Sequence, residues 1–121
     1  MDQRNKTGEL KARLYRFTLR LIALIDVLPG GVVGHRIGDQ LLRSGTSILA
    51  NYVEGQSAAS RREFTNFLRI ALKSANESKV WLCLLRDSKR VSDEQSEWLL
   101  KELGEISSIL ASSVITLKRK Q

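Results

Sequence analysis

Four side chains in the sequence are of types that carry out acid–base, nucleophilic or metal chemistry, namely His35, Glu54, Glu77 and Cys83. The chain has one His and one Cys, and the Glu-x-x-His pattern of di-iron bundles is absent, so the residues predict neither a triad nor a metal site. Cys83 lies in an apolar helical run, where a small buried hydrophobe is the simpler interpretation. We therefore expect no enzymatic activity, no metal and no cofactor, and we interpret Glu54 as a polar structural anchor.

Cationic side chains are the more prominent chemical feature, since 20 Lys and Arg against 13 Asp and Glu give a net charge of +7. The first basic stripe consists of Arg13, Arg16 and Arg20. The second basic stripe consists of Arg62, Arg69 and Lys73, and the basic tail consists of Lys118, Arg119 and Lys120. Such groups neutralise phosphates and release counterions. The sequence therefore predicts sequence-tolerant binding of RNA or DNA that weakens as salt rises, and the alternative is that these are ordinary solvated helix faces.

The aromatic residues give little support to recognition by base stacking. Most of them, such as Phe17, Phe64 and Trp81, occupy apolar positions of predicted helices rather than positions between the cations. Binding through phosphates is the mode that the sequence favours.

Residues 91–117 form an acidic segment within this basic chain. It sets one basic residue, Lys101, against Asp93, Glu94, Glu97, Glu102 and Glu105. An acidic surface suits a basic neighbour. A protein–protein scaffold, on which a larger enzyme docks, is therefore the competing hypothesis.

The element that positions the second basic stripe is a predicted helix over residues 60–88, which contain no Gly and no Pro. Ser60 and Glu63 have the spacing of a capping box. Apolar residues recur behind this cap at intervals of three and four, including Phe64, Leu68 and Leu82. They cover a wider arc than one neighbour fills, so we expect this helix to contact both its own bundle and another subunit.

Three further helices are predicted, over residues 8–28, 35–53 and 92–117. Thr7 is the expected cap of the first, and Ser92 with Gln95 forms a capping box for the last. The segment Pro29-Gly30-Gly31 separates the first two, and Gly55 is the expected left-handed stop of the second. Within the second predicted helix, the small residues 44–47 predict close packing against a neighbouring helix.

Four helices with short loops predict an all-α, antiparallel up-down-up-down bundle in a single domain over residues 1–121. We expect residues 1–7 and 118–121 to be flexible ends. No apolar stretch approaches the roughly 20 residues that span a bilayer, and no secretory signal is visible. With its single Cys, the chain is expected to be cytoplasmic and to bind no membrane.

The stretch from Leu41 to Leu85 resembles a bacterial family of four-helix bundles. The family includes proteins named for intervening sequences of large-subunit ribosomal RNA and the accessory variability determinants of diversity-generating retroelements. The matching residues run in one uninterrupted order, and those that define the structural motif are Ser44, Ser47, Asn51, Glu54, Gly55, Glu77 and Trp81.

The resemblance implies a homopentameric ring of bundles with a basic surface and without enzymatic activity. Members of the retroelement branch bind nucleic acid and join a reverse transcriptase in mutagenic retrohoming, whereas members of the intervening-sequence branch have no settled role. The basic first helix favours the retroelement branch for this chain. The alternative is an intervening-sequence protein that acts as a protein–protein scaffold.

Overall fold

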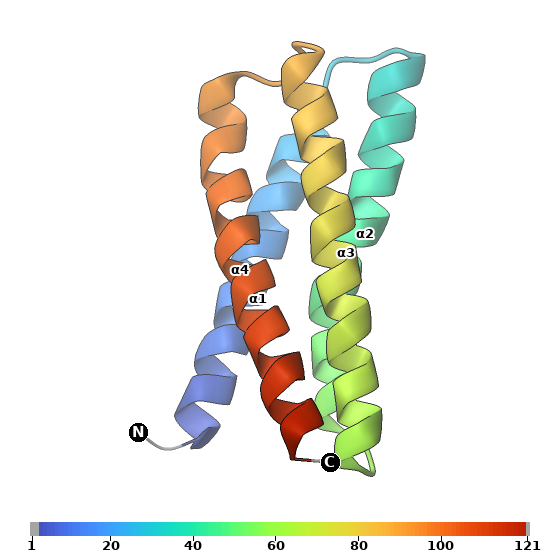
Figure 1. Ribbon diagram of the computed structural model, residues 1–121. Coiled ribbons are helices and arrows are strands. Elements are labelled where there is room, and N and C mark those ends of the chain that lie inside the picture. Colours follow the sequence, from blue (N-terminus) through green and yellow to red (C-terminus); the bar gives the residue numbers. More distant parts are fainter. Residues whose placement is uncertain (1–2, 121) are drawn as a thin grey trace.

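The computed structural model describes the backbone of residues 3–120 and the side chains of residues 8–120. Its four helices are α1 (Gln3–Asp26), α2 (Val32–Gln56), α3 (Arg61–Asp87) and α4 (Asp93–Arg119). They run side by side in alternating directions and are joined by short loops (Figure 1). Each helix packs on the next, and α1 also touches α4, so the four enclose one core in chain order. The predicted all-α four-helix bundle is confirmed for the described residues, which contain no strand.

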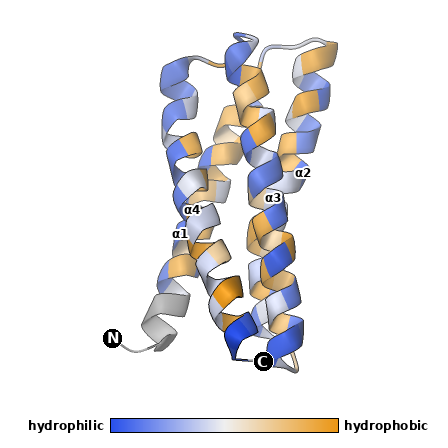
Figure 2. Cartoon of the chain, viewed as in Figure 1, coloured by the Kyte–Doolittle hydropathy of each residue, from blue (hydrophilic) through white to orange (hydrophobic). Residues whose placement is uncertain are grey.

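The core follows from the helical periodicity of the apolar residues, which recur along all four helices (Figure 2). Burial of a Leu or Phe side chain contributes about 1.5–3 kcal/mol to folding. The largest fully buried apolar side chains are Leu14, Phe17, Leu21, Leu41, Ile48, Leu68, Leu82, Leu85, Leu103, Ile106 and Leu110.

The last two helices begin at the predicted caps. Ser60 Oγ accepts a hydrogen bond from the Glu63 N–H at 3.1 Å, but the Glu63 carboxylate accepts from the Ala59 N–H rather than from that of Ser60. At α4 both bonds of the capping box are present, because Ser92 Oγ accepts from the Gln95 N–H and the Gln95 side chain accepts from the Ser92 N–H. These local bonds explain why α3 and α4 begin within one residue of the prediction.

The first two helices begin earlier than predicted. The start of α1 is Gln3 rather than Gly8, so Thr7 lies within the helix, and its side chain is outside the described part, as are residues 1, 2 and 121. The start of α2 is Val32 rather than His35, because Gly31, at a φ of 112°, turns the chain directly into the helix. Residues 3–7 and 118–119, within the expected flexible ends, are helical.

The predicted left-handed stop at Gly55 is wrong, since α2 continues through it to Gln56. Gly55 is buried where α2 meets the start of α3. A Cβ at this position would lie 3.0 Å from Phe64 Cδ1 and 3.1 Å from Phe67 Cβ. The close approach of the two phenylalanines therefore requires the small residue here.

The small residues in the middle of α2 allow close packing, as predicted. A Cβ on Gly45 would overlap the fully buried side chain of Leu21 in α1. Towards α3, Ser44 Oγ and Ser78 Oγ lie 2.8 Å apart and share a hydrogen bond. This short polar pair satisfies two buried hydroxyls without separating the helices.

Some apolar surface is left exposed on the outside of the bundle. On α3, Ile70, Val80 and Leu84 expose 47, 53 and 44 %, and on α1, Tyr15 and Leu19 expose 56 and 52 %. The wide apolar arc predicted for α3 is confirmed, while its contact with another subunit stays a prediction.

None of the described helices combines the length and the apolar character that crossing a membrane requires.

Candidate nucleic-acid interface

The first basic stripe is largely engaged within the bundle. Arg13 projects from α1 to α4, where its Nε donates to Glu102 Oε2 at 3.0 Å and its Nη2 donates to Glu102 Oε1 at 2.8 Å. The same Nη2 also donates to Glu105. The side chains of Arg13 and Glu102 are only 28 and 13 % exposed, so this two-pronged ion pair is partly withdrawn from water. Arg13 therefore holds α1 against α4.

This contact changes the acidity of Glu102. The hydrogen bonds from Arg13 lower the pKa of the Glu102 carboxyl below its ordinary value, against the opposing effect of burial, and the positive charges of Arg13 and Arg16 lower it further. The hydrogen bond to Glu102 likewise raises the pKa of the Arg13 guanidinium. Both shifts stabilise the charged pair.

Arg20, at the other end of this stripe, is engaged by an aromatic ring. Its guanidinium carbon lies 4.3 Å from the ring centroid of Trp98 in α4, which is a cation–π contact. Arg16, between the two, is exposed and forms no hydrogen bond or ion pair with a described side chain. Two of the three cations of the first basic stripe thus hold α1 against α4, and one remains free for a ligand.

The second basic stripe has no such partners. Arg62, Arg69 and Lys73 are all exposed on one face of α3, and none is paired with a described carboxylate. Eleven residues separate the first from the last, so the stripe extends along roughly 16 Å of helix. It is a line of uncompensated positive charge on a rigid element.

The basic tail lies at the same end of the bundle as the start of the second basic stripe. Arg61 Nη1 donates to the backbone carbonyl of Lys120 at 3.1 Å, which ties the beginning of α3 to the end of α4. The start of α3 and the end of α4 thus lie at the same end of the bundle (Figure 1), and Arg62, Lys118, Arg119 and Lys120 are all exposed there. Sequence reasoning missed Arg61, and the only available signal was its position next to Arg62.

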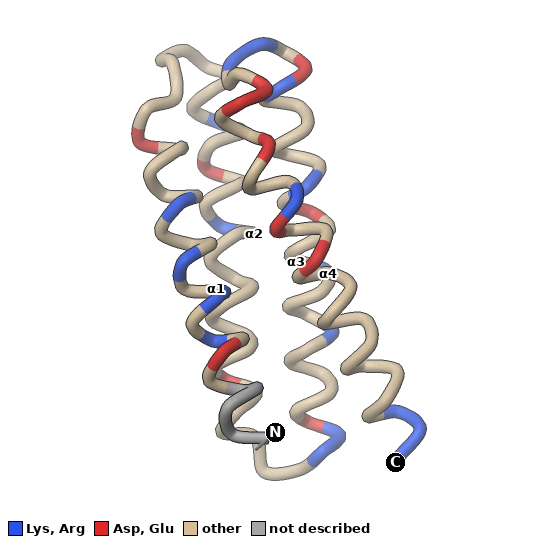
Figure 3. The backbone as a smooth tube through the Cα atoms, turned by 90° about the vertical axis from the view of Figure 1, so that its left-hand side faces the viewer, with Lys and Arg blue, Asp and Glu red and all other residues tan. Residues whose placement is uncertain are grey.

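The acidic segment lies beside α1 rather than beside the second basic stripe. Figure 3 shows acidic residues over the first half of α4 and basic residues along α1 and at the end of α4. Glu94 and Glu97 are exposed, whereas Glu102 and Glu105 bind Arg13. The acidic segment is therefore partly neutralised within the bundle.

The residues of the structural motif gather mostly between α2 and α3. Ser47 Oγ lies 2.8 Å from Ser74 Oγ, and Asn51 Nδ2 donates to both Ser47 O and Ser47 Oγ at 2.9 Å. On α3, Trp81 Nε1 donates to Glu77 Oε2 at 3.0 Å. Of these contacts, the pair Ser47–Ser74 joins α2 to α3, whereas the bonds of Asn51 and Trp81 lie within one helix each.

Glu54 differs from the other motif residues, because it is exposed in the last turn of α2 and forms no side-chain hydrogen bond or ion pair with the described residues. The structure therefore assigns it no anchoring contact.

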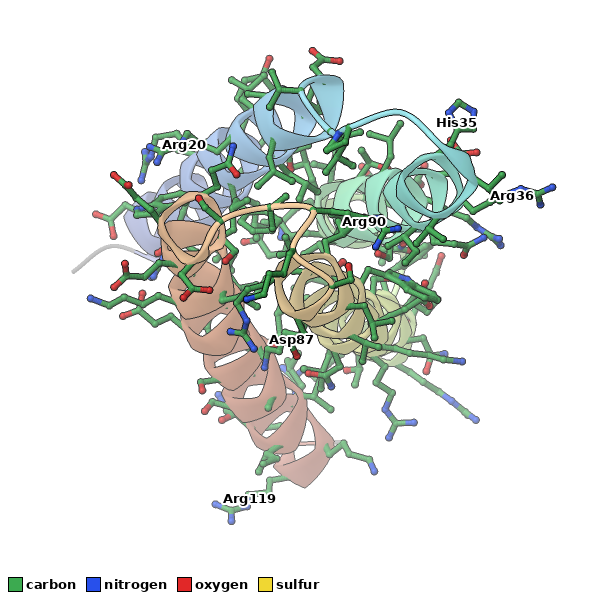
Figure 4. The ribbon with its side chains drawn as sticks, turned by 90° about the horizontal axis from the view of Figure 1, so that it is seen from above. Arg20, His35, Arg36, Asp87, Arg90 and Arg119 are labelled. Atoms are coloured by element: carbon green, nitrogen blue, oxygen red, sulfur yellow. The ribbon has the colours of Figure 1, made fainter. Side chains whose placement is uncertain are left out.

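The side chains that were candidates for chemistry lie apart from one another. His35 is exposed in the first turn of α2 and points away from the bundle, as does Arg36 (Figure 4). Cys83 is half-buried in α3, and Glu77 is bound to Trp81. Within residues 8–120, no three His, Cys, Asp or Glu side chains gather as a metal site would require.

The fold and surface described above define a four-helix bundle with an exposed basic face. Residues 9–112 match the family model described as 23S rRNA-intervening sequence protein. The chain belongs to this family.

The chain is also similar to a crystal structure of a protein with unknown function from the S23 ribosomal protein family of Bacteroides thetaiotaomicron VPI-5482. The two are 37 % identical, the match covers 86 % of this chain and 96 % of that one, and the TM-score is 0.76. A search of curated proteins found no match. The predicted resemblance to the intervening-sequence family is confirmed, and the retroelement branch stays a prediction.

Proposed function

We propose that this protein is a non-enzymatic RNA-binding scaffold of the intervening-sequence family, which binds structured RNA through the second basic stripe and the basic tail. The observation that carries the proposal is the uncompensated charge of Arg62, Arg69 and Lys73 on one exposed face of α3. A rigid line of cations binds phosphates without reading bases, so binding is tolerant of sequence and sensitive to salt.

The intervening-sequence branch fits the matched family description better than the retroelement branch does. The basic first helix favoured the retroelement branch, but Arg13 and Arg20 of that helix are bound by Glu102 and Trp98. Association with a reverse transcriptase therefore has less physical support than RNA binding and stays a prediction.

The test is RNA affinity with two variants of equal charge. Arg62→Gln, Arg69→Gln and Lys73→Gln together remove the second basic stripe, and the control Arg36→Gln, Arg43→Gln and Lys101→Gln removes three exposed cations elsewhere. At about 0.1 M salt we expect the stripe variant to bind an RNA hairpin at least tenfold more weakly than the wild type, and the control to lose less than threefold. Equal losses of RNA affinity in the two variants would show that the net charge, and not the second basic stripe, determines binding, and would contradict the proposal.

We further propose that the bundles assemble into a homopentamer. Support comes from the apolar side chains that a monomer leaves in water, including Ile70 and Leu84 of α3 and Tyr15 and Leu19 of α1. Sedimentation equilibrium is expected to give five chains per particle at micromolar concentration. A monomer over the whole accessible concentration range would contradict this assembly.

A further inference from the structure

An open groove of about 1080 Å³ lies between the N-terminal half of α1 and the C-terminal half of α4. Arg13, which forms ion pairs with Glu102 and Glu105 of α4, lies at one end of the groove. On the N-terminal side of Arg13, no ion pair between described side chains connects α1 with α4. Short side chains line the α4 wall, including Ser112, Ser113 and Thr116, so the helices leave space between them.

The floor of the groove is apolar, although it opens to solvent. It is formed by side chains from all four helices, which are Leu10, Tyr52, Phe64, Leu68, Ile109 and Leu117. Tyr52 and Leu68 are nearly fully buried at the bottom, at 4 and 2 % exposure. The shape is a trough that accepts an apolar stripe rather than an enclosed cavity that surrounds a small molecule.

The rim of the groove carries more positive than negative charge. Among the described lining side chains, Arg16 and Lys120 are exposed cations and Glu9 is an exposed carboxylate, while Arg13 closes one end with its charge paired to Glu102 and Glu105. A ligand that fits this groove therefore combines an apolar stripe with flanking carboxylates.

The walls of the groove are two helices, and the α4 wall from Ile109 to Lys120 extends over about three helical turns, or roughly 16 Å. A helix of similar length presents an apolar stripe at intervals of three and four residues. We propose that this groove binds an acidic amphipathic helix of another protein, which lies between α1 and α4 with its apolar side on the floor.

A second copy of this chain fits the groove less well. Its exposed apolar stripe on α1, Tyr15 and Leu19, is flanked by the cations Lys11 and Arg16, which the rim of the groove would repel. RNA fits the rim but has no apolar stripe for the floor. The groove proposal rests on the apolar floor and Arg16, whereas RNA binding rests on the second basic stripe, and Lys120 of the basic tail belongs to both surfaces.

The test uses two fluorescent synthetic peptides of about 14 residues with the same Leu spacing, one flanked by Glu and the other by Lys. With the full chain, fluorescence anisotropy is expected to show at least tenfold tighter binding of the Glu peptide. Ser112→Trp, which places a large side chain in the groove, should weaken that binding at least tenfold, whereas Ala50→Trp on exposed α2 should leave it unchanged. Arg16→Glu should reverse the preference between the peptides without filling the groove.

Circular dichroism verifies that each variant is folded, and Arg16→Glu tests the groove if Ser112→Trp does not fold. Equal binding of the two peptides, or binding that neither variant changes, overturns the proposal. If Ser112→Trp changes the oligomeric state and unlabelled protein displaces the peptide, the groove is an interface between copies and the proposal is wrong. RNA affinity is expected to be the same in Ser112→Trp and wild type, so the two proposals fail separately.

Discussion

The first and second basic stripes each place three cations along one face of a helix, but their surroundings differ. Beside α1 lies the acidic half of α4, and Arg13 and Arg20 are bound to Glu102 and Trp98. Beside the second basic stripe of α3 there is solvent, and Arg62, Arg69 and Lys73 stay uncompensated. The comparison teaches that the number of cations on a helix does not determine its ligand. What differs between the two stripes is whether a neighbouring helix already supplies a carboxylate or an aromatic ring for the cations.

The comparison predicts a large loss of stability for a substitution in the first basic stripe and a small change for one in the second. Arg13→Gln leaves the partly buried Glu102 carboxylate without its ion pair, so the free energy of unfolding should fall by about 2 kcal/mol. Arg69→Gln removes an exposed cation and should change the free energy of unfolding by less than about 0.5 kcal/mol. Urea denaturation measures both. Similar stability losses in the two variants would remove the distinction between the stripes.

RNA affinity should show the reverse order for the same two variants. Arg69→Gln removes one phosphate contact and is expected to weaken RNA binding several-fold, while Arg13→Gln leaves the second basic stripe unchanged. A larger RNA defect in folded Arg13→Gln would place the ligand on α1.

A smaller effect is expected in the pH dependence of stability. Because Arg13 lowers the pKa of Glu102 in the folded chain, the unfolded chain takes up this proton at a higher pH than the folded chain does. The stabilisation is therefore complete above the ordinary pKa of about 4.5 and is lost as the pH falls through the lower, folded pKa. Between pH 6 and 3, Glu102→Gln should therefore make the fall in unfolding free energy less steep than in the wild type. An unchanged slope in the variant would show that the pair does not stabilise the fold.

The features that sequence analysis predicted well are those that depend on neighbouring residues. Ser92 and Gln95 form their capping box within one turn, and the apolar spacing of α3 defines its buried face. The small residues around Gly45 predicted a close helix contact because few other roles suit such residues in a helix. Periodicity and caps were therefore sufficient for the bundle.

The features that were missed depend on contacts distant in sequence. Arg13 and Glu102 are 89 residues apart, and no local signal indicates that they meet. Gly55 was interpreted as a stop because a Gly near a helix end commonly has that role, whereas here the rings of Phe64 and Phe67 occupy the space. Sequence analysis named the cations of the candidate site. It could not show that Arg13 and Arg20 are bound within the bundle, because their partners lie far away in the sequence.

The central claim is that the second basic stripe contacts RNA phosphates, and the most direct test is the salt dependence of RNA affinity. The logarithm of the association constant is measured against the logarithm of salt concentration for the wild type and for the triple variant of Arg62, Arg69 and Lys73 to Gln. Each phosphate contact contributes about 0.7–0.9 to the slope, so the variant should lose roughly 2–3 from its magnitude. Parallel lines for the two proteins, or a wild-type affinity indifferent to salt, would contradict the claim.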